Sequence, residues 1–259
     1  MKKPPDDKLE FFVLLGMRSP ERLDALCQLI EYWHFHGEKV LLWHHENEPL
    51  PEDHEAFSRL KKKGLEQIAW DWNEDATDFA QPDVTFSGAD VVLFLDYGGK
   101  QLIDTLEILS KWLPQSPLDL ERIITWVHCQ NVSENFLIKR WYETCFHFSD
   151  AVILDAFKDL PATWLKEYQQ HFKTQCYPCI VENTKKGRLK NLQNIVDDQV
   201  RRISQAFEFE QIDMNWDFEI ETEDGEEDDD DFDDLPPKEA FFERNPDGKR
   251  SKIVTDILS

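Results

Sequence analysis

The sequence has few glycines, few basic residues and no long hydrophobic run. Its 259 residues include 9 glycines, and 29 Lys and Arg stand against 53 Asp and Glu, which gives a net charge of −24. Because no run of about 18 apolar residues occurs, we expect no segment to span a bilayer. The excess of negative charge repels nucleic-acid phosphates and anionic lipids, so we predict no direct nucleic-acid binding and no membrane binding.

Cysteine is scarce and irregularly spaced. The five cysteines are Cys27, Cys129, Cys145, Cys176 and Cys179. An odd, scattered set predicts free thiols in a reducing compartment, and the first residues lack the apolar stretch of a secretory signal, so we expect a cytoplasmic protein. The Cys176–Cys179 pair has C-x-x-C spacing but leads into a strand-like segment. A structural role is therefore favoured over redox or metal chemistry, which stays the open alternative.

Hydrophobic residues make up 41% of the chain, enough for a buried core, and the charge is unevenly placed. Residues 208–235 contain 16 acids and no Lys or Arg, whereas residues 1–207 carry a net charge of about −9. This break in composition predicts one α/β domain over residues 10–206 and an acidic, largely disordered tail over residues 207–259.

Apolar runs alternate with amphipathic segments before this boundary. The strand-like runs cover 11–15, 39–43, 67–70, 89–96, 122–127, 151–154 and 179–181. The helix-like segments cover 21–36, 51–63, 100–113, 134–148, 162–172 and 189–203. Continuous rather than alternating apolar strands indicate burial on both faces, so we predict a doubly wound, mostly parallel α/β sheet. Ligands of such sheets bind where the strands end, which directs attention to the loops after each strand.

The loop after the first strand reads Gly16-Met17-Arg18-Ser19-Pro20-Glu21-Arg22-Leu23. It resembles the G-x-x-x-x-G-K-[ST] loop of the CobW-like group of P-loop GTPases, whose relatives include metallochaperone GTPases, and the resemblance implies a P-loop NTPase-like fold. Gly16 matches the first glycine and Arg22 falls on the lysine. Glu21 stands at the second glycine, and Leu23 at the residue that holds Mg²⁺.

Two later segments extend the resemblance, which covers about residues 10–205 in the group's order. Phe94-Leu95-Asp96-Tyr97-Gly98-Gly99 is similar to the Walker B region, which implies that Asp96 holds Mg²⁺ through water and that the Gly99 N–H meets a γ-phosphate. Alternatively, Asp96 simply caps the next helix. Residues 148–160 resemble the guanine-reading segment, with Asp159 as the base-reading acid and Ala156 in place of a lysine. The group's Cys-x-Cys-Cys metal motif is absent.

The chemistry of the first loop argues against ordinary phosphate binding. A carboxylate at Glu21 repels phosphate, Pro20 lacks an N–H donor, and Leu23 offers no oxygen to a metal ion. Arg22 keeps a positive charge, although Arg and Lys are not equivalent at a point-charge site. The candidate cofactor-binding residues are Gly16, Arg22, Asp96, Gly99 and Asp159, with GTP and Mg²⁺ as the implied cofactors. No catalytic residue is assigned.

Metal-capable side chains gather after the second strand-like run, at His44, His45, Glu46 and Glu48. Adjacent residues of a strand point to opposite faces, so both histidines do not chelate one ion while the strand continues. We therefore favour solvated loop residues and leave the identity of any metal ligand unassigned.

These observations predict a non-catalytic or weakly nucleotide-binding scaffold or regulatory protein on a CobW-like GTPase fold. The alternative is a divergent GTPase that hydrolyses GTP with Mg²⁺, and a third reading is an acidic decoy that occupies a basic partner. A protein partner is expected to bind the acidic tail, where apolar and polar residues alternate around Trp216. Beyond the acids, Phe241-Phe242 and the basic residues 249–252 form either a short docking element or part of a solubilising tail.

Overall fold

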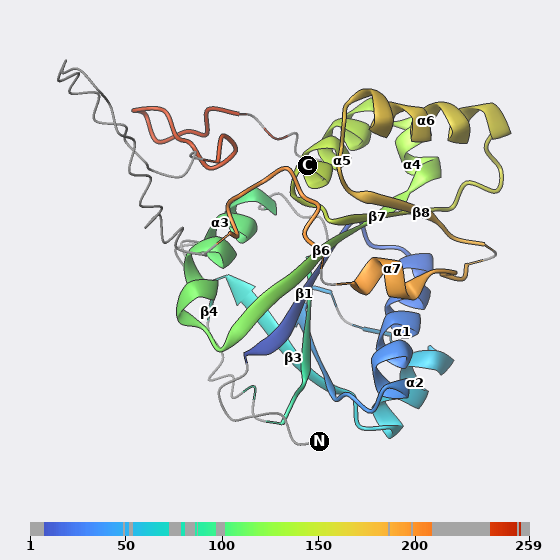
Figure 1. The fold of residues 1–259 in the computed structure, drawn as a ribbon, viewed down its shortest axis with the longest axis vertical. Coiled ribbons are helices and arrows are strands. Elements are labelled where there is room, and N and C mark those ends of the chain that lie inside the picture. Colours follow the sequence, from blue (N-terminus) through green and yellow to red (C-terminus); the bar gives the residue numbers. More distant parts are fainter. Residues whose placement is uncertain are drawn as a thin grey trace, which may run out of the picture.

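The computed structural model describes residues 8–48, 50–51, 54–72, 79–80, 86, 88–96, 102–185, 187–197, 199–208, 239–252 and 254. A single sheet forms the centre of the molecule, with helices on both faces (Figure 1). The strands are β1 (Leu9–Leu15), β2 (Val40–His45), β3 (Glu66–Trp72), β4 (Phe79–Ala80), β5 (Val91–Leu95), β6 (Leu118–His128), β7 (Ala151–Asp155) and β8 (Ile180–Asn183). Their order is β4-β3-β2-β5-β1-β6-β7-β8, and every pairing is parallel except that of β3 with β4. The predicted doubly wound, mostly parallel α/β sheet is confirmed.

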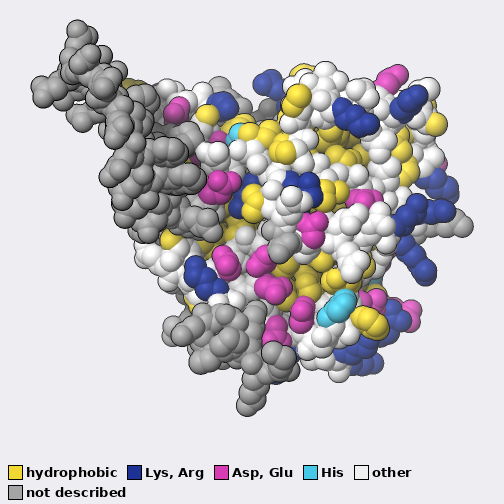
Figure 2. Space-filling view, in the orientation of Figure 1, with side chains coloured by type: hydrophobic (Ala, Val, Ile, Leu, Met, Phe, Trp, Pro, Cys, Tyr) yellow, Lys and Arg dark blue, Asp and Glu magenta, His cyan; other side chains and the backbone are white. Residues whose placement is uncertain are grey.

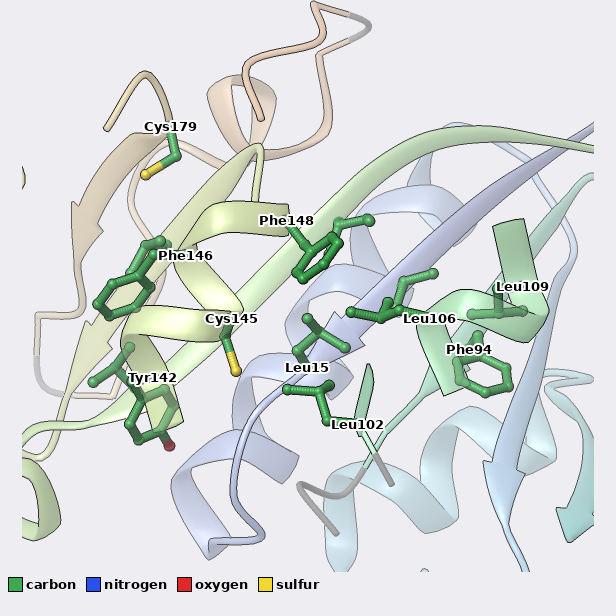
Figure 3. Close-up of a cluster of buried hydrophobic side chains, with 14 of the residues drawn as sticks. Leu15, Phe94, Leu102, Leu106, Leu109, Tyr142, Cys145, Phe146, Phe148 and Cys179 are labelled. Atoms are coloured by element: carbon green, nitrogen blue, oxygen red, sulfur yellow. The ribbon is translucent and has the colours of Figure 1, made fainter. Parts of the chain in front are cut away.

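The helices bury both faces of the sheet because residues of each strand alternate between two cores. The helices are α1 (Pro20–Phe35), α2 (Glu55–Lys62), α3 (Leu102–Trp112), α4 (Cys129–Glu134), α5 (Phe136–Phe148), α6 (Ala162–Thr174) and α7 (Leu192–Val196), with a 3₁₀ turn at Leu113–Gln115. On β1, Phe12 and Leu14 face the core shared with α1, α2 and α7. Leu15 faces the core of α3, α5 and α6, where it lies near Leu102 and Phe148 (Figure 3).

The carboxyl end of β1 lies where the winding of the sheet changes direction. Helix α1 carries the chain from β1 to β2 over one face, and α3 carries it from β5 to β6 over the other. In doubly wound sheets a crevice opens at such a switch point. The loops that follow β1, β2 and β5 therefore meet at one place.

The predicted amphipathic helix over residues 189–203 is wrong. Of the residues described in this range, α7, Leu192–Val196, alone is helical, and Val200 and Ile203 are exposed. The Asp197 backbone is extended, and its side chain accepts a hydrogen bond from the Gln199 amide, which makes a turn that ends the helix. The predicted helix over 134–148 is present as α5, which begins at Phe136 because the Asn135 side chain caps its start.

The chain after the acidic stretch returns to the domain. Residues 239–252, which we call the C-terminal strap, pack beside α3 and α5, and the Phe242 ring stacks on Phe148 at 5.8 Å between ring centroids. Residues 209–238, which hold most of the predicted acidic tail, lie outside the described residues, so the domain boundary near residue 207 stays a prediction.

Charged side chains are unevenly distributed on the face shown in Figure 2. In Figure 2, Lys and Arg side chains line much of the right-hand margin, whereas several Asp and Glu side chains gather in the lower centre.

Among the described residues, no helix is long and apolar enough to cross a membrane.

Candidate functional site

The loop between β1 and α1 forms the centre of the candidate site. The Ser19 side chain accepts a hydrogen bond from the Arg22 amide at 3.1 Å and so caps α1, and Pro20 occupies the first helical turn, where its missing N–H costs nothing. The sequence thus specifies a sharp change from strand to helix at this point. This is the position at which P-loop proteins bind phosphate.

Gly16 is required by the close approach of this loop to β6. Its φ of +135° lies in a region that residues with a side chain rarely adopt. A Cβ atom at Gly16 would lie 2.3 Å from the Trp126 carbonyl oxygen. The glycine therefore has a structural reason to be present that is independent of any phosphate.

The loop amide of Met17 has a partner inside the protein. It donates a hydrogen bond to the Tyr142 hydroxyl at 3.3 Å, and the His128 amide approaches the same oxygen at 3.5 Å. Tyr142 is fully buried on α5 (Figure 3), and this burial raises the pKa of its phenol well above the ordinary value. The neutral Tyr142 hydroxyl thus accepts the hydrogen bond of an amide that a phosphate-binding loop would use to bind its ligand.

Arg22 is buried and tied to three chain segments. Its Nη1 donates to Glu48 Oε1 at 2.9 Å, and its Nη2 donates to the Leu14 carbonyl at 3.1 Å and to the Asp96 carbonyl at 2.7 Å. Arg22 is 3% exposed and Glu48 is 6% exposed, so the ion pair is largely shielded from solvent. The guanidinium therefore joins the ends of β1 and β5 to the loop after β2, and its charge is balanced within the protein.

The structure brings three of the predicted site residues together and places a fourth apart. Gly16, Arg22 and Asp96 lie at the ends of the adjacent strands β1 and β5, and the Asp96 amide donates to the Leu14 carbonyl at 3.0 Å. Asp159 is exposed in the loop after β7, two strands away from β1. Gly99 lies outside the described residues. The roles of all five in binding nucleotide stay predictions.

Acidic charge is present at the start of α1. Glu21 Oε2 lies 4.0 Å from His128 Nε2, and the other ring nitrogen of His128 accepts a hydrogen bond from the Asn131 amide. His128 thereby caps α4 and faces the carboxylate. A phosphate at this end of α1 would meet the negative charge of Glu21.

A cavity of about 600 Å³ opens beside the Arg22–Glu48 pair. Its apolar wall comes from β1, β5, α1 and the segment after β2, through Leu14, Leu95, Leu23, Leu26 and Leu50. Ser19, Arg18 and His54 also border it. Leu23, at the position predicted to hold Mg²⁺ in a working P-loop, forms part of this apolar wall.

His44, His45 and Glu48, three of the metal-capable side chains at and after the end of β2, have partners within the protein. The buried His45 ring accepts a hydrogen bond from the Asn47 amide at 2.9 Å, and its other nitrogen lies 3.5 Å from Asp71. Burial lowers the pKa of His45 despite the nearby carboxylates. Within the described part of the chain, no three His, Cys, Asp or Glu side chains are placed to hold a metal ion.

Tyr142 was missed in the sequence, and Glu48 was named only as a metal-capable loop residue and not as the partner of Arg22. Tyr142 lies 125 positions from Met17, and Glu48 lies 26 positions from Arg22. The sequence indicated only that a buried arginine needs a carboxylate partner, and it did not indicate which carboxylate.

Comparisons with solved structures find P-loop GTPases at low similarity. The signal recognition particle receptor FtsY from Elizabethkingia anophelis is 12% identical, with a TM-score of 0.44 over 74% of this chain and 64% of that one. The cell division protein FtsY from Thermotoga maritima is 15% identical, with a TM-score of 0.44 over 74% of this chain and 68% of that one. The Zn(II)-bound YjiA GTPase from E. coli is 12% identical, with a TM-score of 0.38 over 74% of this chain and 66% of that one.

The chain therefore spans about two thirds of the length of these structures. No protein-family model and no curated protein matches the sequence. At these scores the similarities assign neither a family nor an activity, and the functional reading depends on the geometry of the site.

Proposed function

We propose that this chain is a binding or regulatory protein on a P-loop GTPase-like fold and that it does not hydrolyse GTP. The observation that carries the proposal is the internal use of the loop groups. The Arg22 guanidinium is bound to Glu48 and to two strand-end carbonyls, and the Met17 amide is bound to Tyr142. A triphosphate that used the Met17 amide or these guanidinium nitrogens would first have to break these contacts.

The surroundings of Arg22 support the same reading. Separating a buried ion pair leaves an uncompensated charge and typically costs about 3–5 kcal/mol. Glu21 adds repulsion at the start of α1, and Leu23 contributes apolar surface to the neighbouring cavity. We infer that the edge of the sheet which binds phosphate in P-loop proteins instead stabilises the domain here.

The competing proposal is a divergent GTPase that binds GTP and Mg²⁺. It is favoured by the placement of Gly16, Arg22 and Asp96 around one strand end, next to the N-terminus of a long helix. Under that proposal Arg22 would leave Glu48 when nucleotide binds. The two proposals differ in measurable affinity.

Isothermal titration calorimetry with GTP, GDP and ATP, each with Mg²⁺, distinguishes them. We expect no binding tighter than about 1 mM, because occupied donors cannot supply the usual phosphate contacts. Micromolar binding that is lost in Arg22→Ala and retained in Arg59→Ala, an exposed arginine on α2, would overturn the proposal. Circular dichroism at the titration temperature would show that both variants are folded, so that the loss is specific to the site.

A protein partner for the acidic stretch is part of the same proposal. The 16 acids of residues 208–235 would attract a basic surface and raise its association rate. Described residues on either side of this stretch are joined, because the Ser204 hydroxyl donates to Glu239 Oε2 at 2.6 Å.

A further inference from the structure

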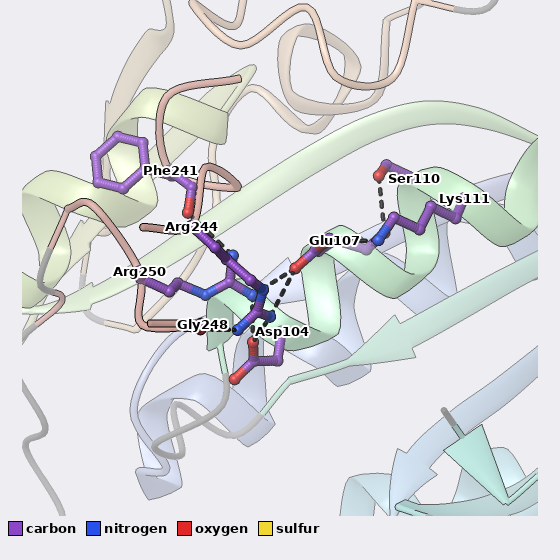
Figure 4. A network of polar contacts seen from close by, with 8 residues as sticks. All are labelled: Asp104, Glu107, Ser110, Lys111, Phe241, Arg244, Gly248 and Arg250. Atoms are coloured by element: carbon purple, nitrogen blue, oxygen red, sulfur yellow. Dashed lines mark hydrogen bonds and ion pairs between the residues drawn. The ribbon is translucent and has the colours of Figure 1, made fainter. Parts of the chain in front are cut away.

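The C-terminal strap is held to the domain by side chains. Arg244 Nη2 lies 3.2 Å from Asp104 Oδ1 and 3.1 Å from Glu107 Oε2, both on α3 (Figure 4). Arg250 pairs with the same two carboxylates, at 2.6 Å from Glu107. At the other end of the strap, Glu239 accepts hydrogen bonds from His147 and Ser204.

Aromatic rings fill the space between these polar ends. Phe241 lies 4.9 Å from the His147 ring and 5.6 Å from the Phe148 ring, and Phe242 stacks on Phe148. We call the surface formed by Asp104, Glu107, His147 and Phe148 the α3–α5 groove. It combines two carboxylates with an aromatic floor, which suits a peptide that carries paired aromatic and guanidinium groups.

Backbone hydrogen bonds fold the strap on itself. The Phe242 amide donates to Glu239, the Asn245 amide to Lys249, and the Ser251 amide to Glu243, at 2.7–2.9 Å. Among the described residues, the backbone hydrogen bonds of the strap all close within it, so that only side chains attach it to the groove. The strap therefore has the character of a folded peptide ligand joined to its own receptor.

We propose that the α3–α5 groove is a peptide-binding site, occupied here in cis by the strap, and that it accepts a partner segment with two aromatic residues followed by two arginines. Release of the strap would leave Asp104 without its arginine partners and Glu107 with Lys111 alone, a net negative surface that favours a basic segment. A second copy of this chain is a poor occupant, because two chains of −24 repel each other.

Fluorescence anisotropy with a labelled synthetic peptide of residues 239–252 tests this proposal in the full-length chain. The tethered strap competes at a millimolar effective concentration, so wild type should bind the peptide weakly. The triple variant Phe242→Ala, Arg244→Ala, Arg250→Ala weakens the strap and should bind the peptide at least tenfold more tightly than wild type. Adding Asp104→Asn and Glu107→Gln to that variant should remove at least tenfold of the affinity.

Lys249→Ala is the matched control, since it removes a strap cation whose side chain is 83% exposed and lies 3.7 Å from Asp247, within the strap itself. It should leave peptide affinity at the wild-type value. Circular dichroism and melting temperature establish that each variant is folded. A folded triple variant that does not bind the peptide, or binding that survives loss of Asp104 and Glu107, would overturn the proposal. A strap-exchanged dimer seen by sedimentation would overturn the choice of a partner over a second copy.

Discussion

Single residues in the loop after β1 show how contacts inside the protein replace contacts to a ligand. Gly16 permits the loop to approach β6. The Tyr142 hydroxyl accepts a hydrogen bond from the Met17 amide, and the Arg22 guanidinium pairs with Glu48. Each of these groups has a partner within the chain. Substitutions here should therefore alter stability even when no nucleotide is present.

We expect Gly16→Ala to destabilise the protein by roughly 3 kcal/mol or more, because the new Cβ is strained at φ +135° and meets a backbone oxygen. Gly37→Ala is the matched control: φ is +85° there and nothing lies within 4 Å of the added atom, so a cost of about 1–2 kcal/mol is expected. Urea unfolding measures both. Equal losses in the two variants would show that contact with Trp126 contributes nothing.

The candidate site could be located from the sequence, but its contacts could not. Gly16 and Arg22 were identifiable because a short apolar strand, a glycine and an amphipathic helix follow one another locally. The partners of Arg22 come from segments 8, 26 and 74 positions away, and sequence periodicity carries no information about such pairings. The resemblance to a phosphate-binding loop thus predicted where the loop lies, and only the three-dimensional contacts show how its donors are used.

Among the elements, strands were predicted better than helix ends. Runs such as 151–154 match β7 because burial on both faces requires continuous apolar residues. The prediction of one helix over 189–203 was wrong because the spacing of apolar residues gives no information about the turn at Asp197. The docking of the strap on α3 was likewise outside the reach of local patterns, since it joins residues 137–146 positions apart.

The attachment of the strap to the domain depends on ionised carboxylates. Burial alone would raise the pKa of Glu107, but hydrogen bonds and charge from Lys111 and Arg250 lower it from 4.5 to about 2. Burial would also raise the pKa of Glu239, but hydrogen bonds from His147, Ser204 and the Phe241 amide lower it to about 2. Each carboxylate therefore stabilises the folded state above pH 4.5, and this contribution is lost as the pH falls towards 2.

Urea unfolding of wild type and Glu107→Gln at several pH values tests this linkage. Between pH 4.5 and pH 2, we expect wild type to lose on the order of 2 kcal/mol more stability than Glu107→Gln, because the variant has no carboxyl to protonate. Glu167→Gln, which removes an exposed carboxyl of α6, should follow the wild-type profile. Parallel pH profiles for wild type and Glu107→Gln would contradict the assignment of Glu107 as a strap anchor.

At the scale of the whole molecule, the two cores enclose almost all of the cysteine. Cys27, Cys129, Cys145 and Cys179 are buried, and only Cys176 is exposed. Burial raises the pKa of Cys27, Cys129 and Cys179 to about 12, and it also raises that of Cys145 well above its ordinary value. Since the thiolate is the reactive form, packing of the entire domain controls how many thiols react.

We expect one thiol per native chain to react rapidly with a disulfide reagent such as Ellman's at pH 8, and five after unfolding in guanidinium. The fast phase should vanish in Cys176→Ser, while the denatured count falls to four. Because the four slow cysteines lie on α1, on α4, on α5 and just before β8, their protection reports on both faces of the sheet at once. Two or more fast thiols in the native protein would mean that at least one face is packed differently from the arrangement described, and the Cys176→Ser trace would show whether the second thiol reacts independently of the first.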